Sequence, residues 1–125
     1  MKITRFEDIK CWQEARRLTQ HIYQITLQNA FATDFELKDQ IRGAAGSIMH
    51  NIAEGFDAGS TAEFSRFLCY AQRSCSEVQS QLYVALDQHY IDQADFAALY
   101  EQAAITKQMI GGFIKYLKNA SHPKP

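Results

Sequence analysis

Four long segments of the chain carry apolar residues spaced alternately four and three positions apart. This spacing places the apolar side chains on one face of an α-helix, as in helices that pack about 20° from parallel. No window alternates apolar and polar residues with a period of two, so we predict no strands. The stripes are Cys11, Ala15, Leu18, Ile22 and Ile25; Leu37, Ile41, Ala44, Ile48 and Ile52; Phe64, Leu68, Ala71, Cys75, Val78, Leu82 and Ala85; and Leu99, Ala103, Thr106, Ile110, Phe113 and Leu117.

The connections between these segments are short, and short connections make consecutive helices antiparallel neighbours. Ser60 and Glu63 fit a capping box at the start of the third helix, and Asp92 is placed to cap the fourth. The sequence therefore predicts an all-α protein. We expect an antiparallel up-down-up-down four-helix bundle in a single domain over residues 1–120, with a flexible tail at 121–125.

Composition excludes several classes of protein. The chain has 125 residues and a formal net charge of -1, which argues against a dedicated DNA-binding domain because such domains carry a basic excess. No stretch approaches the roughly 18 apolar residues of a membrane helix. An apolar leader is not visible, and the three cysteines do not form a paired pattern. We therefore expect a cytoplasmic protein with no membrane partner.

The sequence gives little support to an enzyme. It has no Glu-x-x-His pair for a di-iron bundle, no Cys-x-x-Cys and no phosphate-binding glycine loop. His50 and Glu54, four residues apart, are more simply two surface residues than metal ligands. Cys11 and Cys75 fall on core stripes, whereas Cys69 points away from its stripe. We predict no catalytic residues, no metal and no cofactor.

Polar residues form a row beside the second stripe and another beside the third. These rows face each other or a second subunit, or they are two solvated flanks. On the first interpretation, buried charges must be paired, so Arg66 and Arg73 would meet Glu54 or Glu77. The predicted structural network consists of Gln40, Asn51, Glu54, Arg66 and Glu77.

Two other faces are candidates for a subunit interface. Glycine inside a helix costs about 1 kcal/mol relative to alanine, and Gly43 and Gly46 lie on the side of the second helix that points away from its stripe. They are either tolerated surface glycines or a place where another helix approaches closely. On the fourth helix, Ile105, Met109 and Tyr116 form an apolar row outside the stripe. Phe6 and Ile9 also lie off the first stripe.

Basic residues suggest a second kind of surface. Lys10 and Arg17 are seven positions apart and share a face of the first helix, opposite its stripe. With Arg16 and Arg42 they could contact RNA or DNA weakly, or they could form an ordinary solvated face.

Several motifs together resemble a known family. They are Phe6-Glu-Asp-Ile-Lys-Cys-Trp12, Asp39-Gln-Ile-Arg42, Asn51-Ile-Ala-Glu-Gly55, Glu63-Phe-Ser-Arg-Phe-Leu68 and Ser74-Cys-Ser-Glu77. In this order they resemble the bacterial four-helix bundle proteins related to the 23S rRNA intervening-sequence protein. The resemblance implies an up-down bundle, and several members of the family assemble as homopentamers with a central channel. One related branch, the accessory protein of diversity-generating retroelements, uses a basic surface to bind nucleic acid and a reverse transcriptase.

Two positions depart from the pattern of this family. Gly43 stands where the family usually has a second arginine, and Arg73 stands where it commonly has glycine. Together with the near-neutral charge, the loss of the arginine argues against transferring nucleic-acid binding to this chain. We therefore expect a non-enzymatic homo-oligomeric scaffold or adaptor, with a pentamer as the best single expectation and a nucleoprotein as a partner. The alternative is an accessory protein that binds RNA or DNA directly through the basic face of the first helix.

Overall fold

The four predicted helices form at the positions that the apolar stripes indicate. The structure, a computed structural model, describes residues 2–121, and no strand occurs within that range. Apart from Ser121, the predicted tail lies outside the described residues. The elements are η1 (Phe6–Asp8), α1 (Lys10–Ile25), η2 (Asn29–Thr33), α2 (Phe35–Phe56), α3 (Thr61–Asp87) and α4 (Gln93–Ser121), where η denotes a short 3-10 helix.

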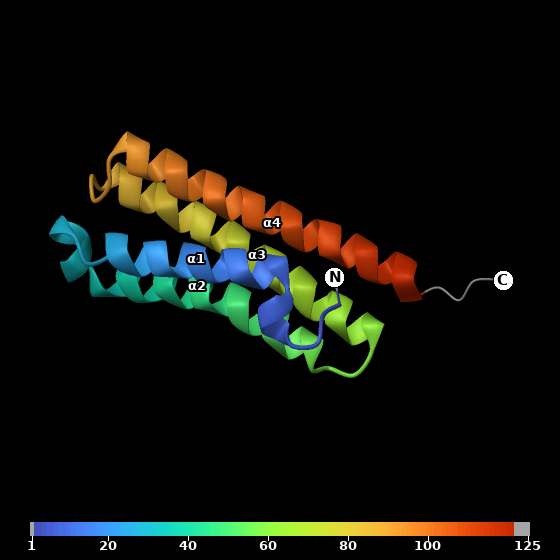
Figure 1. Ribbon diagram of the computed structural model, residues 1–125. Helices are drawn as coiled ribbons and strands as arrows, with labels where there is room; N and C mark the ends of the chain where they lie inside the picture. Colours follow the sequence, from blue (N-terminus) through green and yellow to red (C-terminus); the bar gives the residue numbers. More distant parts are fainter. Residues whose placement is uncertain (1, 122–125) are drawn as a thin grey trace.

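The helices run up and down in sequence and form an antiparallel bundle (Figure 1). Helix α2 packs on α3, α3 packs on α4, and α1 closes the bundle by packing against both α2 and α4. Side-chain caps fix three of the helix starts: an oxygen of Asp34, Ser60 or Asp92 accepts a hydrogen bond of 2.7–3.2 Å from the backbone amide three residues later. The caps of the third and fourth helices confirm the sequence prediction.

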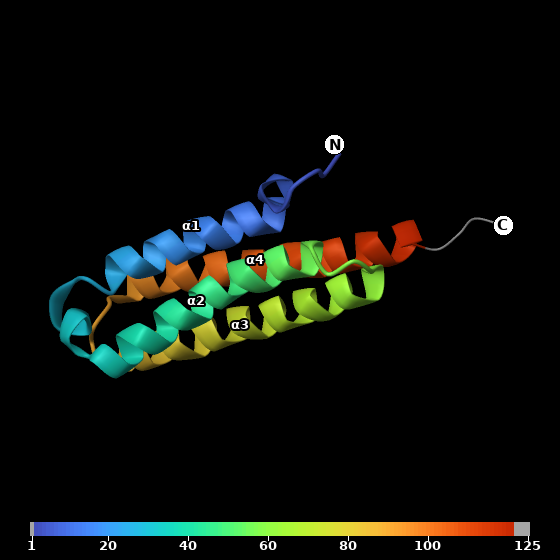
Figure 2. The same ribbon diagram turned by 90° about the horizontal axis from the view of Figure 1, so that it is seen from below.

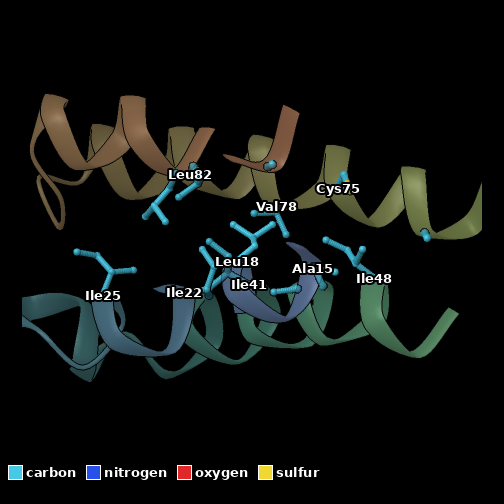
Figure 3. Close-up of a cluster of buried hydrophobic side chains, with 14 of the residues drawn as sticks. Ala15, Leu18, Ile22, Ile25, Ile41, Ile48, Cys75, Val78 and Leu82 are labelled. Carbon is cyan, nitrogen blue, oxygen red and sulfur yellow. The ribbon is translucent and has the colours of Figure 1, made fainter. Parts of the chain in front are cut away.

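The core is built from the predicted stripes. All the stripe residues of α1, α2 and α3 are buried except Phe64, which is partly buried. Figure 3 shows side chains from α1, α2 and α3 pointing toward one another, including Leu18, Ile41 and Val78. On α4 the stripe is buried as far as Ile110, and its last two residues, Phe113 and Leu117, are only partly buried.

Helix α4 extends well past the start of α1. It has 29 residues against 16 in α1, a difference of about 20 Å at a rise of about 1.5 Å per residue. Two views at right angles show this overhang, and the N-terminal segment lies at the same end of the bundle (Figures 1 and 2). In this segment Ile9 is only 2% exposed, and Phe6 packs edge-on against Trp12 with ring centroids 5.2 Å apart. The sequence pattern placed Ile9 outside the core. This prediction was wrong, because Ile9 is buried just before α1 begins.

Candidate subunit interface

An apolar groove lies between the overhang of α4 and the N-terminal segment. It has a volume of about 400 Å³, and its lining is mainly apolar. On the α4 side, the rings of Phe113 and Tyr116 stack with centroids 6.0 Å apart, and Tyr116 is 58% exposed. The lining consists of Ile3, Asp8, Ile9, Lys10, Cys11, Met109, Gly112, Phe113 and Tyr116.

Hydrogen bonds hold the N-terminal wall of this groove in place. The backbone N–H and the side-chain hydroxyl of Thr4 both donate to Asp8 Oδ2 at 3.1 Å. The bond from the Thr4 backbone holds the pKa of the Asp8 carboxyl below its usual value, with a smaller contribution from the nearby Arg5. The Asp8 charge is thus engaged within the segment, and Lys10 is the other charged residue that lines the groove.

The groove continues a second heptad-like stripe along α4. Ala98, Gln102, Ile105, Met109, Gly112 and Tyr116 are spaced alternately four and three residues apart. In the first half of α4 this stripe meets α1 at Gln102, which donates to Glu14 at 3.2 Å and bonds His21 at 2.8 Å, whereas Ala98 is exposed. Burial alone would raise the pKa of Glu14, but hydrogen bonds from Arg17 and Gln102 lower it. Beyond Met109 no helix of this chain covers the stripe within residues 2–121, and that uncovered part lines the groove.

The outward side of α2 forms a second unusual face. Glu36, Asp39, Gly43, Gly46, His50, Ala53 and Asp57 repeat at three and four residues along it. An added Cβ would meet nothing within 4 Å at Gly43, and at Gly46 it would meet only the ring of His50 at 3.6 Å. Nothing inside the chain therefore requires glycine at Gly43, and the helix backbone is bare over this part of α2.

The structure places the five predicted interface residues on these two surfaces. Met109 and Tyr116 line the groove, and Ile105, which is 42% exposed, continues the same stripe. Gly43 and Gly46 lie on the outward face of α2. Sequence analysis did not find the contributions of Ile3 and Ile9, because both precede the first helix and belong to no helical pattern.

The predicted network between α2 and α3 does not form in the chain. Gln40, Glu54 and Glu77 are exposed, and so is Arg66, which pairs with Glu63 of its own helix. Asn51 is partly buried but bonds Ser47 of its own helix, through the Ser47 carbonyl at 2.9 Å and its hydroxyl at 3.0 Å. The prediction was wrong because long charged side chains on a helix flank reach water, which avoids the cost of burying them.

Small hydroxyl groups form the polar contact that does cross from α2 to α3. Ser74 donates to Ser47 at 3.1 Å, and Ser74 is 5% exposed. Between α3 and α4, the side chain of Lys107 donates to Ser76 at 2.8 Å, and Gln72 donates to the Lys107 carbonyl at 3.2 Å. These contacts stabilise packing and bring no reactive group together.

The predicted nucleic-acid residues do not gather at one place. Arg16 and Arg17 line a shallow polar hollow of about 440 Å³ together with Arg5, whereas Lys10 lies on the apolar groove. Arg42, on α2, lies beside the C-terminal end of α1. Its guanidinium is 4.3 Å from the centroid of the Tyr23 ring and donates to the Thr26 hydroxyl at 2.8 Å.

The arginines of the hollow also have partners within the chain. Arg17 forms an ion pair with Glu14 at 2.7 Å, and Arg5 is 3.7 Å from Asp8. Arg16 lies over the Trp12 ring at 5.9 Å. Acidic neighbours reduce the positive potential that a phosphate would meet at this surface.

Two of the three cysteines are buried, and one is exposed. Burial raises the pKa of the Cys11 thiol and of the Cys75 thiol to about 12, whereas Cys69 is exposed. Over residues 2–121, no three His, Cys, Asp or Glu side chains lie close enough to hold a metal ion. No described helix is both long and apolar enough to cross a membrane.

Comparison with known proteins agrees with the motifs quoted above. The family model described as "23S rRNA-intervening sequence protein" matches residues 7–112. The chain belongs to this family. The match covers α1, α2 and α3 and reaches Gly112, which lines the groove on α4. No curated protein is similar enough to the chain to be a relative by sequence.

A solved structure shares the fold. It is the crystal structure at 1.70 Å of a protein of unknown function from the S23 ribosomal protein family of Bacteroides thetaiotaomicron. The similarity has a TM-score of 0.76 and 20% sequence identity, and it covers 84% of this chain and 98% of that chain. At this identity the likeness shows a common fold only.

Proposed function

We propose that this member of the 23S rRNA-intervening sequence protein family is a non-enzymatic scaffold or adaptor that assembles into a homo-oligomeric ring. The observation that carries the proposal is the apolar groove along the overhang of α4. An apolar groove of this kind, flanked by exposed Tyr116 and Ile105, is typical of an interaction surface. Most soluble oligomers are homo-oligomers with closed symmetry, so a second copy of the chain is its simplest occupant.

The number of subunits comes from the family resemblance. Several four-helix bundles of this family form pentamers, and a pentamer is therefore our proposal for this chain. The bundle buries a core of its own and does not need assembly in order to fold. Assembly would then serve to present five copies of an outer surface to a partner, for which we propose a nucleoprotein.

Placing a charge in the groove should abolish assembly. Tyr116→Glu replaces an apolar ring on the exposed rim of the groove by a carboxylate, which a partner that covers the groove would have to desolvate. We expect light scattering after size exclusion to fall from the mass of the oligomer to that of the 14.3 kDa chain. Ala97→Glu is the matched control, because it adds the same charge at an exposed α4 position outside the groove. Equal masses for Tyr116→Glu and wild type would remove the groove from the interface.

Direct binding of RNA is the second candidate function. The hollow lined by Arg5, Arg16 and Arg17 favours it, since arginine is the residue best suited to binding phosphate. The name of the family refers to an rRNA insertion, which makes RNA the first nucleic acid to test. The acidic partners of these arginines and the net charge of -1 weigh against a tight complex.

We predict little nucleic-acid binding at physiological salt. Any complex at low salt should depend on Arg16, Arg17 and Lys10, and it should weaken steeply as salt rises because counterion release drives phosphate contacts. A fluorescence titration with RNA and with DNA, at low salt and at about 150 mM, measures this. Arg16→Gln with Arg17→Gln should remove the low-salt binding, whereas Arg73→Gln, on α3, should leave it intact. A submicromolar complex at the higher salt would contradict the prediction.

A further inference from the structure

We propose that the groove on α4 is occupied by the outward face of α2 from the next copy in the ring. This inference rests on the proposed function and specifies which two surfaces meet. The α2 face is defined by Glu36, Asp39, Gly43, Gly46, His50, Ala53 and Asp57. The receiving surface is the second stripe of α4 from Ile105 to Tyr116, together with the wall formed by Ile3 and Ile9.

The geometry of the groove favours a helix as its occupant. Over the first half of α4, the second stripe contacts α1 at Gln102, which bonds Glu14 and His21, while Ala98 and Ile105 on either side are exposed. Past the start of α1, the same stripe continues without a covering helix. A helix of a second copy lying on the overhang would therefore extend, along the same face of α4, the contact that α1 makes at Gln102.

Charge complementarity selects α2 as that helix. The α2 face defined above carries three acidic residues, Glu36, Asp39 and Asp57, and no lysine or arginine. From residue 102 to residue 121, α4 carries no acidic residue. Lys10 lines the groove and Lys115 and Lys118 lie on the overhang, whereas Lys107 is directed to Ser76 of α3. Opposite charge steers the two surfaces together.

The sizes of the side chains are complementary as well. The α4 stripe presents Ile105, Met109 and Tyr116, which are large, whereas the α2 face is bare at Gly43. Large side chains of one helix can fill the space over glycines of another, which allows the two helices to approach closely. The open space at Gly43 thus has a use between copies that it lacks within the chain.

The same charges disfavour symmetric pairing of either surface with itself. Two α4 overhangs would bring lysines together, and two α2 faces would bring carboxylates together, and like charges across an interface are repulsive. The two surfaces lie on different helices, so their contact is head-to-tail. A head-to-tail contact forms a ring when its rotation closes.

Mixing two blocked variants tests this pairing. Gly43→Leu fills the bare part of α2, where nothing inside the chain is within 4 Å of the new Cβ, and leucine is the better helix former, so the variant should fold. Tyr116→Glu blocks the groove and leaves α2 intact. We expect each variant alone to have the mass of one chain. An equimolar mixture should give a heterodimer of two chains, because one intact α2 face meets one intact groove. Ser80→Leu, at an exposed α3 position, should keep the wild-type mass.

The outcomes separate the pairing from the proposed ring itself. If Gly43→Leu keeps the wild-type mass, α2 is not the occupant, although the ring remains. If either variant forms a homodimer, the contact is symmetric and the pairing is wrong. A mixture that stays monomeric at concentrations where wild type assembles also overturns it. A monomeric wild type overturns the proposed function, whatever the variants do.

Discussion

Gly55→Ala should destabilise the bundle by about 1–3 kcal/mol, the usual cost of overpacking a core. The added Cβ would lie 2.7 Å from Cδ1 of Phe64 and 3.0 Å from Cβ of Phe67, at the place where α2 and α3 approach each other. The Phe64 ring is held edge-on between Phe56 and Phe113, with centroid distances of 6.3 and 5.5 Å. The Phe67 Cβ is fixed to the backbone of α3, so the two helices must move apart.

Thermal unfolding measures this effect, and we expect the melting temperature to fall by roughly 5–15 °C. The matched control is Gly43→Ala, the same change in the same helix where no atom lies within 4 Å of the new Cβ. It should stabilise the chain by up to about 1 kcal/mol through helix propensity. Both changes are made in Tyr116→Glu, so that assembly does not contribute to the measured stability. A stability unchanged by Gly55→Ala would mean that α2 and α3 are not this close.

Cys11 and Cys75 should resist thiol reagents far more strongly than Cys69 in the native protein. Burial raises the pKa of both thiols to about 12 from an ordinary value of 9.0, and their exposed fractions are 2% and 0%. Because the thiolate is the reactive form, near pH 8 this lowers their ionised fraction about a thousandfold, in addition to the steric protection. Labelling with a chromogenic disulfide should therefore modify one thiol rapidly per chain, and three after denaturation.

Cys69→Ser should abolish the rapid phase and leave two slow thiols. The same pKa shifts fix the sign of a pH effect on stability. The neutral thiols favour the folded state fully below the ordinary pKa of 9.0, and this contribution is lost as the pH rises toward 12. Rapid modification of all three thiols in the folded protein would contradict the burial of Cys11 and Cys75.

The core could be predicted from the sequence because its signal is local. A spacing of four and three fixes which side of each helix is apolar, and helices with one apolar side bury it. Ile9 escaped this reasoning because it lies before α1, where no helical spacing applies. Its burial depends on the path of the N-terminal segment, which the contact of Phe6 with Trp12 helps to set.

The polar rows beside the core could not be assigned from spacing alone. A flank of a helix is buried or exposed according to how closely the neighbouring helix approaches, and side-chain length then decides which atoms meet. On the α2–α3 seam, the short side chains of Ser47 and Ser74 meet, whereas Glu54 and Glu77 extend into water. Arg66 finds its partner three residues away on the same helix, which costs less conformational freedom than a pair between helices.

The candidate interface was predictable only in part. Met109 and Tyr116 form a row that is visible in the sequence, and the structure places both on one groove. The overhang that leaves this row uncovered depends on the difference in length between α1 and α4. Helix lengths depend on where each helix ends. Pro123 follows α4 two residues after Ser121 and is a stop signal, whereas no glycine or proline follows closely after Ile25 to mark the end of α1.

The mass of the wild-type protein in solution tests the central claim most directly. Native mass spectrometry, together with light scattering at micromolar concentration, counts the chains in the assembly. The account predicts a single species of about five times the 14.3 kDa chain mass. A single species at the mass of one chain would contradict the ring, the occupied groove and the scaffold function together.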